Sequence, residues 1–121
     1  MTPHEAEIPR IIREPISLAE LADMAAGQFG ELVKVVVDIG RGIMTAGGAL
    51  HADEEAILIE DGSRQEDLWG INIFPSKSGE DFIEFDSMIN IRPVVGNRTR
   101  GVEDPEMQRN IQEIVSRLIT R

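Results

Sequence analysis

The sequence predicts an α+β fold, an antiparallel β-meander of about four strands with helices packed on one face. Apolar residues recur at helical spacing between 18 and 46 and again between 105 and 119. From about 55 to 92 they alternate with polar residues instead, as in strands. The joins between these alternating segments are short and contain glycine, which favours antiparallel pairing of consecutive strands. The predicted order of elements is β-α-α-β-β-β-α.

The first two elements have local sequence signals. Residues 8–13 are rich in isoleucine and predict a strand, and the proline among them restricts this strand to a sheet edge. Ser17, followed three residues later by Glu20, forms a capping box that predicts a helix start. We expect this helix to end near Gly27 or Gly30.

Residues 31–46 allow two interpretations. The apolar residues follow helical spacing over the whole segment, which predicts a helix in which Gly40 permits close packing. The β-branched run VKVVVDI favours a buried strand instead. The length of the periodic pattern favours the helix, and Gly47 with Gly48 would end it.

Three strands and a helix complete the predicted fold. The strands are expected at 56–60, 68–75 and 82–92, where apolar and polar residues alternate. In the last of them one face would carry Ile83, Phe85, Ile89 and Ile91, and the other would carry Glu84, Asp86, Asn90 and Arg92. Asp104 predicts the N-cap of a final helix, with Pro105 in its first turn.

Composition narrows the class of protein. The chain has 121 residues, which fits a single α+β domain at 8–121 behind a flexible tail at 1–7. It contains no cysteine, which excludes disulfides and thiolate metal sites. No apolar run approaches the roughly 18 residues of a membrane span, so we expect a cytoplasmic protein without a membrane partner. The net charge of −10 repels phosphate backbones, and no nucleic-acid partner is expected.

An arginine-rich loop stands out in this acidic chain. Four side chains in it could converge on a carboxylate or phosphate group: Arg92, Asn97, Arg98 and Arg100. A purely structural role is the alternative, in which the arginines pair with the acidic residues of 103–106 and of the sheet and thereby fix the loop. The acidic residues beside the loop favour this structural role.

A metal site has weaker support. On a strand, His51, Asp53 and Glu55 would share one face, and imidazole with carboxylates suits zinc, manganese or iron. A catalytic site normally has three protein ligands, and the other histidine, His4, lies in the tail. No cofactor is therefore expected, and these three residues are retained only as candidates.

Several sequence runs are similar to those of a known family. GGALHADEEAILIEDGSRQEDLWGINIFP, EFDSMINIRP and GNRTRGVEDPE resemble a family of small uncharacterised prokaryotic proteins, catalogued as a domain of unknown function. The resemblance extends from about Ile11 to Ile119. It implies no known activity, substrate or cofactor.

The sequence thus favours a binding module, with a small anionic ligand or a protein partner at the arginine-rich loop. A small metal-dependent hydrolase that uses His51 and neighbouring carboxylates is the alternative. The position of His51 relative to the loop separates these hypotheses, because residues on opposite sides of the fold cannot form a joint site. A homo-oligomer is also expected, since a second copy could cover a wide apolar helical face.

Overall fold

A five-stranded antiparallel sheet organises residues 9–121, the part of the chain that the computed structural model describes. In spatial order its strands are β1 (Arg10–Ile12), β4 (Ile43–Ala46), β3 (Val33–Asp38), β5 (Leu68–Ile73) and β6 (Ile83–Glu84). Two further strands, β2 (Ile16–Ser17) and β7 (Ile119–Thr120), pair in parallel near the C-terminus. The predicted α+β class with an antiparallel sheet is confirmed.

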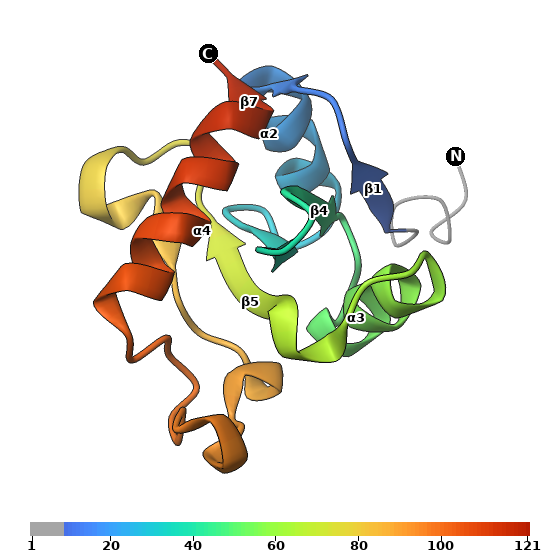
Figure 1. The fold of residues 1–121 in the computed structure, drawn as a ribbon. Coiled ribbons are helices and arrows are strands. Elements are labelled where there is room, and N and C mark those ends of the chain that lie inside the picture. The colour runs from blue at the N-terminus through green and yellow to red at the C-terminus, as the bar shows by residue number, and fades with distance from the viewer. Residues whose placement is uncertain (1–8) are drawn as a thin grey trace.

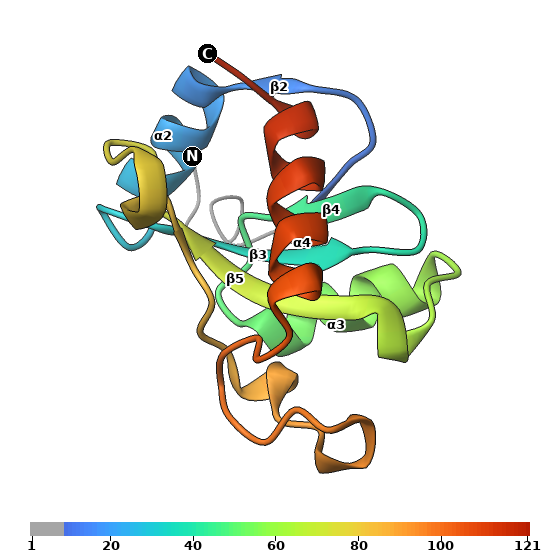
Figure 2. The same cartoon turned by 60° about the vertical axis from the view of Figure 1, so that its left-hand side comes forward.

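Helices cover both faces of this sheet. α2 (Leu18–Gly27) and α4 (Pro105–Leu118) lie on one face, and α3 (His51–Glu60) lies on the other (Figures 1 and 2). The predicted packing of helices on one face therefore holds for α2 and α4 but not for α3. The larger core forms between the first face and α2 and α4, while Leu58 of α3 packs with Val36 on the second face. The sheet is therefore buried on both sides.

The prediction of a helix at 31–46 is wrong. These residues form the β3–β4 hairpin, in which Val36 pairs with Thr45 and Val37 with Met44. Valines 35, 36 and 37 are all buried, because helices lie against both faces of this strand. A strand that is covered on both faces has a continuous run of apolar residues, rather than alternating apolar and polar residues. The rejected interpretation of VKVVVDI as a buried strand is correct.

The prediction of a strand at 56–60 is also wrong. These residues form the second half of α3, whose buried positions are His51, Glu54 and Leu58. The spacing of three and four residues is helical, but two of the three buried side chains are polar. The helical spacing of the buried residues is therefore not visible in the pattern of apolar residues alone.

The last predicted strand, at 82–92, is mostly not a strand. Only Ile83–Glu84 pair with β5, and the chain then turns through the short 3-10 helix η3 (Met88–Asn90). Ile83 and Ile89 contact different cores, so the predicted common face does not form. The meander is also interrupted: β5 pairs with β3, with β4 and α3 lying between them in the sequence.

Other predicted elements are confirmed. β1 occupies a sheet edge. The hydroxyl of Ser17 accepts a hydrogen bond from the Glu20 amide at 3.1 Å, and α2 ends at Gly27. The carboxylate of Asp104 accepts from the Glu106 amide at 2.9 Å, with Pro105 opening α4.

Two further predictions concern the N-terminal residues and membrane-spanning segments. The predicted tail at 1–7, with His4, lies outside the described residues. Within residues 9–121, every helix is too short or too polar to cross a lipid bilayer.

Candidate functional site

His51 and the arginine-rich loop lie on the same side of the sheet. His51 is the first residue of α3, and its Nε2 atom lies 2.7 Å from the carbonyl oxygen of Ile71 in β5. A carbonyl oxygen only accepts hydrogen bonds, so Nε2 carries a proton. In the neutral ring the Nδ1 atom then keeps its lone pair and can accept a proton or a hydrogen bond.

Burial is the main influence on this imidazole. It lowers the pKa of His51 below the usual 6.5, because the charged ring would lose its hydration. The hydrogen bond to Ile71 and the carboxylate of Asp86 act in the opposite direction, whereas the charges of Lys34 and Arg100 lower the pKa further. The neutral ring therefore predominates at neutral pH.

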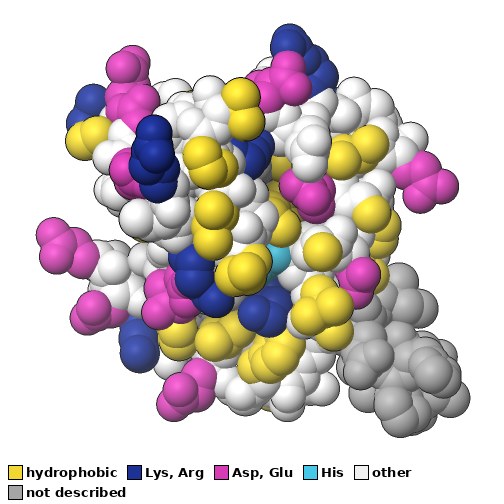
Figure 3. Space-filling view, turned by 90° about the horizontal axis from the view of Figure 1, so that it is seen from below, with side chains coloured by type: hydrophobic (Ala, Val, Ile, Leu, Met, Phe, Trp, Pro, Cys, Tyr) yellow, Lys and Arg dark blue, Asp and Glu magenta, His cyan; other side chains and the backbone are white. Residues whose placement is uncertain are grey.

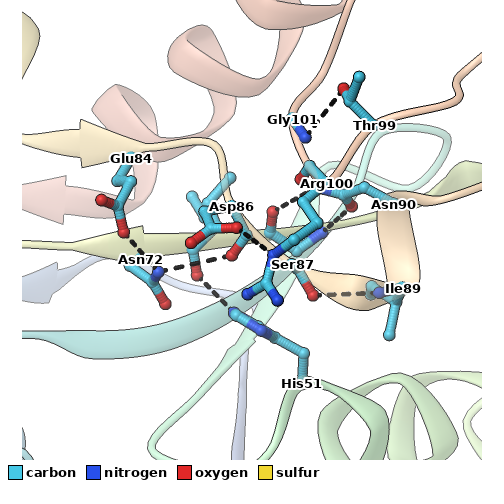
Figure 4. A network of polar contacts seen from close by, with 12 residues as sticks. His51, Asn72, Glu84, Asp86, Ser87, Ile89, Asn90, Thr99, Arg100 and Gly101 are labelled. Atoms are coloured by element: carbon cyan, nitrogen blue, oxygen red, sulfur yellow. Dashed lines mark hydrogen bonds and ion pairs between the residues drawn. The ribbon is translucent and has the colours of Figure 1, made fainter.

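The charges that act on His51 include an ion pair from the arginine-rich loop. Nε of Arg100 donates to Oδ1 of Asp86 at 2.6 Å, and Figure 4 shows this pair above the His51 ring. The two side chains are 54% and 41% exposed. Exposed pairs contribute at most about 1 kcal/mol, so a bound anion could compete with Asp86 for the guanidinium.

Asn72 of β5 forms the floor of this cluster. It is only 5% exposed, and its Nδ2 atom donates to Oε1 of Glu84 at 2.8 Å. Its Oδ1 atom is buried and has no hydrogen-bond partner among residues 9–121. A buried acceptor without a partner costs about 1–3 kcal/mol, which makes it a candidate contact for a ligand donor.

The polar layer continues beneath α3. Lys34 of β3 lies opposite Asn72 of β5. On the other side of β3, the Gly47 amide donates to the Lys34 carbonyl oxygen, and Thr45 lies two residues before Gly47 in β4. Glu54, one turn after His51, is fully buried and accepts a hydrogen bond from the Gly48 amide at 3.0 Å. Among the described residues, the hydroxyl of Thr45 and Oε1 of Glu54 also lack partners. Burial raises the pKa of Glu54 well above 4.5 and keeps its carboxyl protonated over a wider pH range.

Arg92 and Asn97, two of the predicted anion contacts, donate hydrogen bonds to backbone carbonyl oxygens instead. The guanidinium of Arg92 donates to the carbonyl oxygens of Gln65 at 2.7 Å and Leu68 at 2.5 Å, and it lies 4.4 Å from the centre of the Trp69 ring. Nδ2 of Asn97 lies within hydrogen-bond distance of three carbonyl oxygens, which belong to Asn90, Thr99 and Gly101.

The other two predicted contacts face solvent. Arg98 is fixed through its amide, which donates to the Glu103 carboxylate at 2.5 Å, and its side chain is exposed. Arg100 is therefore the member of the predicted set that the fold brings to His51. Asn72, Glu84 and Asp86 were not predicted as site residues. The alternation of 82–92 placed two of them on one face, but no sequence signal linked that face to His51.

The metal candidates do not form a cluster. His51, Asp53 and Glu55 lie on a helix rather than a strand, which turns Asp53 away from the other two. Within residues 9–121, no group of three or more histidine, aspartate or glutamate side chains is arranged to hold a metal ion. The geometric premise of the metal hypothesis, a shared strand face, is therefore wrong.

The chain was compared with known proteins. A family described as "Protein of unknown function (DUF5674)" matches residues 10–118. The chain belongs to this family. The match covers all of the candidate site, from Lys34 to Arg100, and confirms the resemblance to an uncharacterised family. Searches of curated proteins and of solved structures found no significant match.

Proposed function

We propose that this member of the DUF5674 family binds a small molecule that carries an anionic group and a hydrogen-bond donor. The supporting observation is the buried, unpartnered Oδ1 atom of Asn72 beside His51 and the Arg100–Asp86 pair. Figure 3 shows the imidazole, in cyan, in a hollow bordered by hydrophobic and positively charged side chains. This combination of apolar walls and few polar groups is typical of small-molecule sites.

The chemistry of the ligand follows from the groups that surround the hollow. Arg100 and Lys34 are cationic, and the backbone N–H groups that open α3 add partial positive charge, since no side chain caps them; Asp53 in the same turn offsets part of this charge. These groups favour a carboxylate or phosphate. The Asn72 Oδ1 atom and the Glu84 carboxylate can accept hydrogen bonds, so they favour an amino or hydroxyl group on the same ligand.

A thermal-shift screen tests this proposal. The probes are inorganic phosphate, small hydroxycarboxylic acids and α-amino acids, each compared with sodium chloride at equal ionic strength. A ligand that binds only the native state raises the melting temperature in proportion to the logarithm of its concentration above Kd. We expect at least one probe with both an anionic group and a donor to stabilise the wild type.

Variants locate the binding. Arg100→Gln and His51→Gln should abolish the stabilisation, whereas Arg109→Gln, on the exposed side of α4, should leave it unchanged. A probe that stabilises all four proteins equally would place its site elsewhere. If no probe of these classes stabilises the wild type, the proposal is wrong.

A further inference from the structure

The loop surface, defined as residues 87–102, differs in charge from the rest of the molecule. It contains Arg92, Arg98 and Arg100 and no acidic residue, although the chain has 22 of them. The net charge of −10 therefore consists of +3 in this segment and −13 elsewhere. Charge segregation of this kind on a small protein is a recognised basis for selective association.

Large apolar side chains are exposed on the same segment. Val94 is 97% exposed, Met88 64% and Val95 57%, and Ile91 is also exposed. Single exposed apolar residues are common on protein surfaces, but four within eight residues concentrate exposed apolar area on one short segment. Figures 1 and 2 show that this segment projects from the end of the fold that carries α3, away from α2. Figure 3, which views that end, shows apolar and positively charged side chains side by side.

This exposure belongs to an ordered loop. A backbone bridge joins Arg92 and Asn97, and the short turn Pro93–Val95 between them ends at Gly96 with a positive φ of 85°. The Asn97 carboxamide fixes both sides of the loop, since its Oδ1 atom accepts from the Glu103 amide at 2.9 Å. A rigid loop loses little conformational entropy on binding, which favours association through the side chains that it presents.

We propose that the loop surface docks an acidic, amphipathic segment of a partner protein. The apolar side chains of the partner would cover Val94, Val95 and Met88, and its carboxylates would pair with Arg98, whose guanidinium is exposed. Arg100, two residues further along the loop, adds a second exposed positive charge, which pairs with Asp86 in the free protein. This inference does not depend on the small-molecule site, because Val94 and Arg98 have no part in the His51 cluster.

Other occupants fit the charge distribution less well. A two-fold dimer through this surface would bring two segments of charge +3 together. Nucleic acid and an anionic membrane would be repelled by the −13 charge of the remaining residues. A peptide segment contacts the loop locally and avoids most of that repulsion.

Fluorescence anisotropy with a defined probe tests the docking. The probe is a short fluorescein-labelled peptide that alternates glutamate and leucine, and the matched control peptide alternates lysine and leucine. The wild-type protein should bind the acidic peptide alone, with an affinity that falls as salt is added. Val94→Ser and Arg98→Glu should each weaken binding about tenfold, as expected for anchor residues of an interface.

Control variants separate docking from loss of fold. Val94 and Arg98 are exposed, so their substitution should leave the melting temperature unchanged. Ile59→Ser on α3 and Arg109→Glu on α4 remove an exposed apolar and an exposed basic residue elsewhere, and neither should affect binding. His51→Gln should also bind the peptide normally, which distinguishes this surface from the small-molecule site.

Three outcomes would overturn the proposal. The first is absence of binding by the acidic peptide, or equal binding of the basic one. The second is sedimentation of the protein as a dimer that Val94→Ser dissociates, which would assign the loop surface to a second copy. The third is flotation with vesicles of phosphatidylcholine and phosphatidylserine that requires Val94, which would assign it to a membrane.

Discussion

The carboxamide of Asn90 takes the place of a β-strand partner for Gly70. Its Oδ1 atom accepts from the Gly70 amide at 2.8 Å, and its Nδ2 atom donates to the Gly70 carbonyl oxygen at 2.9 Å. Nδ2 also reaches the carbonyl oxygen of Arg100 at 2.9 Å. One buried side chain therefore joins the central strand β5 to the loop that carries Arg100, and it allows the chain to leave the sheet after Glu84.

Loss of this side chain should destabilise the protein strongly. Asn90→Ala leaves the amide and the carbonyl of Gly70 buried without these partners, and each such group costs about 1–3 kcal/mol. We expect the free energy of unfolding to fall by about 2–4 kcal/mol in urea titrations. Asn110→Ala, at an exposed position of α4, is the matched control and should change it by less than about 0.5 kcal/mol. Equal stability of the two variants would contradict this role for Asn90.

Gly70 should not tolerate a side chain. A Cβ atom there would lie 2.5 Å from the Ser87 Cβ atom and 3.2 Å from Cγ1 of Ile89. Gly70→Ala should therefore lower the free energy of unfolding by about 1–3 kcal/mol through overpacking. In Gly27→Ala, at the end of α2, the added Cβ atom meets nothing within 4 Å, and the protein should be unchanged or slightly more stable. Thermal unfolding of both variants measures the difference.

Glu54 should make stability depend on pH. An unfolded glutamate ionises near pH 4.5, whereas the buried group keeps its proton to a higher pH. Between these two pKa values the unfolded state loses a proton that the native state retains, so the wild type becomes less stable as pH rises. A glutamine side chain at this position does not titrate. Relative to the wild type, Glu54→Gln should therefore gain stability progressively above about pH 4.5.

The control for this prediction lies on the same helix. Ile59 is exposed, and Ile59→Ser neither removes nor adds a titratable group, so its stability difference from the wild type should not depend on pH in this window. Melting temperatures at a series of pH values measure both differences. A flat difference for Glu54→Gln as well would show that the native pKa of Glu54 is not raised.

His51 should titrate below its usual range, and a bound anion should reverse that shift. NMR titration of the imidazole should give a pKa below 6.5 in the free protein, since burial disfavours the charged ring. The stability contributed by the neutral ring is present above pH 6.5 and is lost as the pH falls through the native pKa. A carboxylate or phosphate bound beside the ring should raise this pKa. An unchanged pKa in the presence of a stabilising probe would place that probe away from His51.

Arg92 should report on the packing of the single tryptophan. Its guanidinium covers the Trp69 ring and donates to the carbonyl oxygens of Gln65 and Leu68. Lysine cannot reproduce the planar two-point contact, so Arg92→Lys should shift the native fluorescence of Trp69 and lower stability by about 1–2 kcal/mol. Arg98→Lys, at an exposed position of the same loop, should leave both signals unchanged.

Local patterns allowed part of the fold to be predicted. The caps at Ser17 and Asp104 and the edge position of β1 depend on nearby residues, and they were predicted correctly. The family was also recognisable from sequence runs alone. The errors lie where burial is decided by distant segments. β3 was mistaken for a helix because both of its faces are covered, and α3 was mistaken for a strand because His51 and Glu54 are its buried residues.

The candidate site shows the same division. The residue pattern was enough to identify an acidic chain with an arginine-rich loop and a single histidine, His51, after residue 8. That Arg100 and not Arg92 lies beside this histidine depends on the three-dimensional fold, because the sheet brings α3, β5 and the loop together. The side-chain amides of Asn72, Asn90 and Asn97 acquire their roles in the same way. A hydrogen bond is specified by the positions of both partners, and here those partners come from segments that are distant in the sequence.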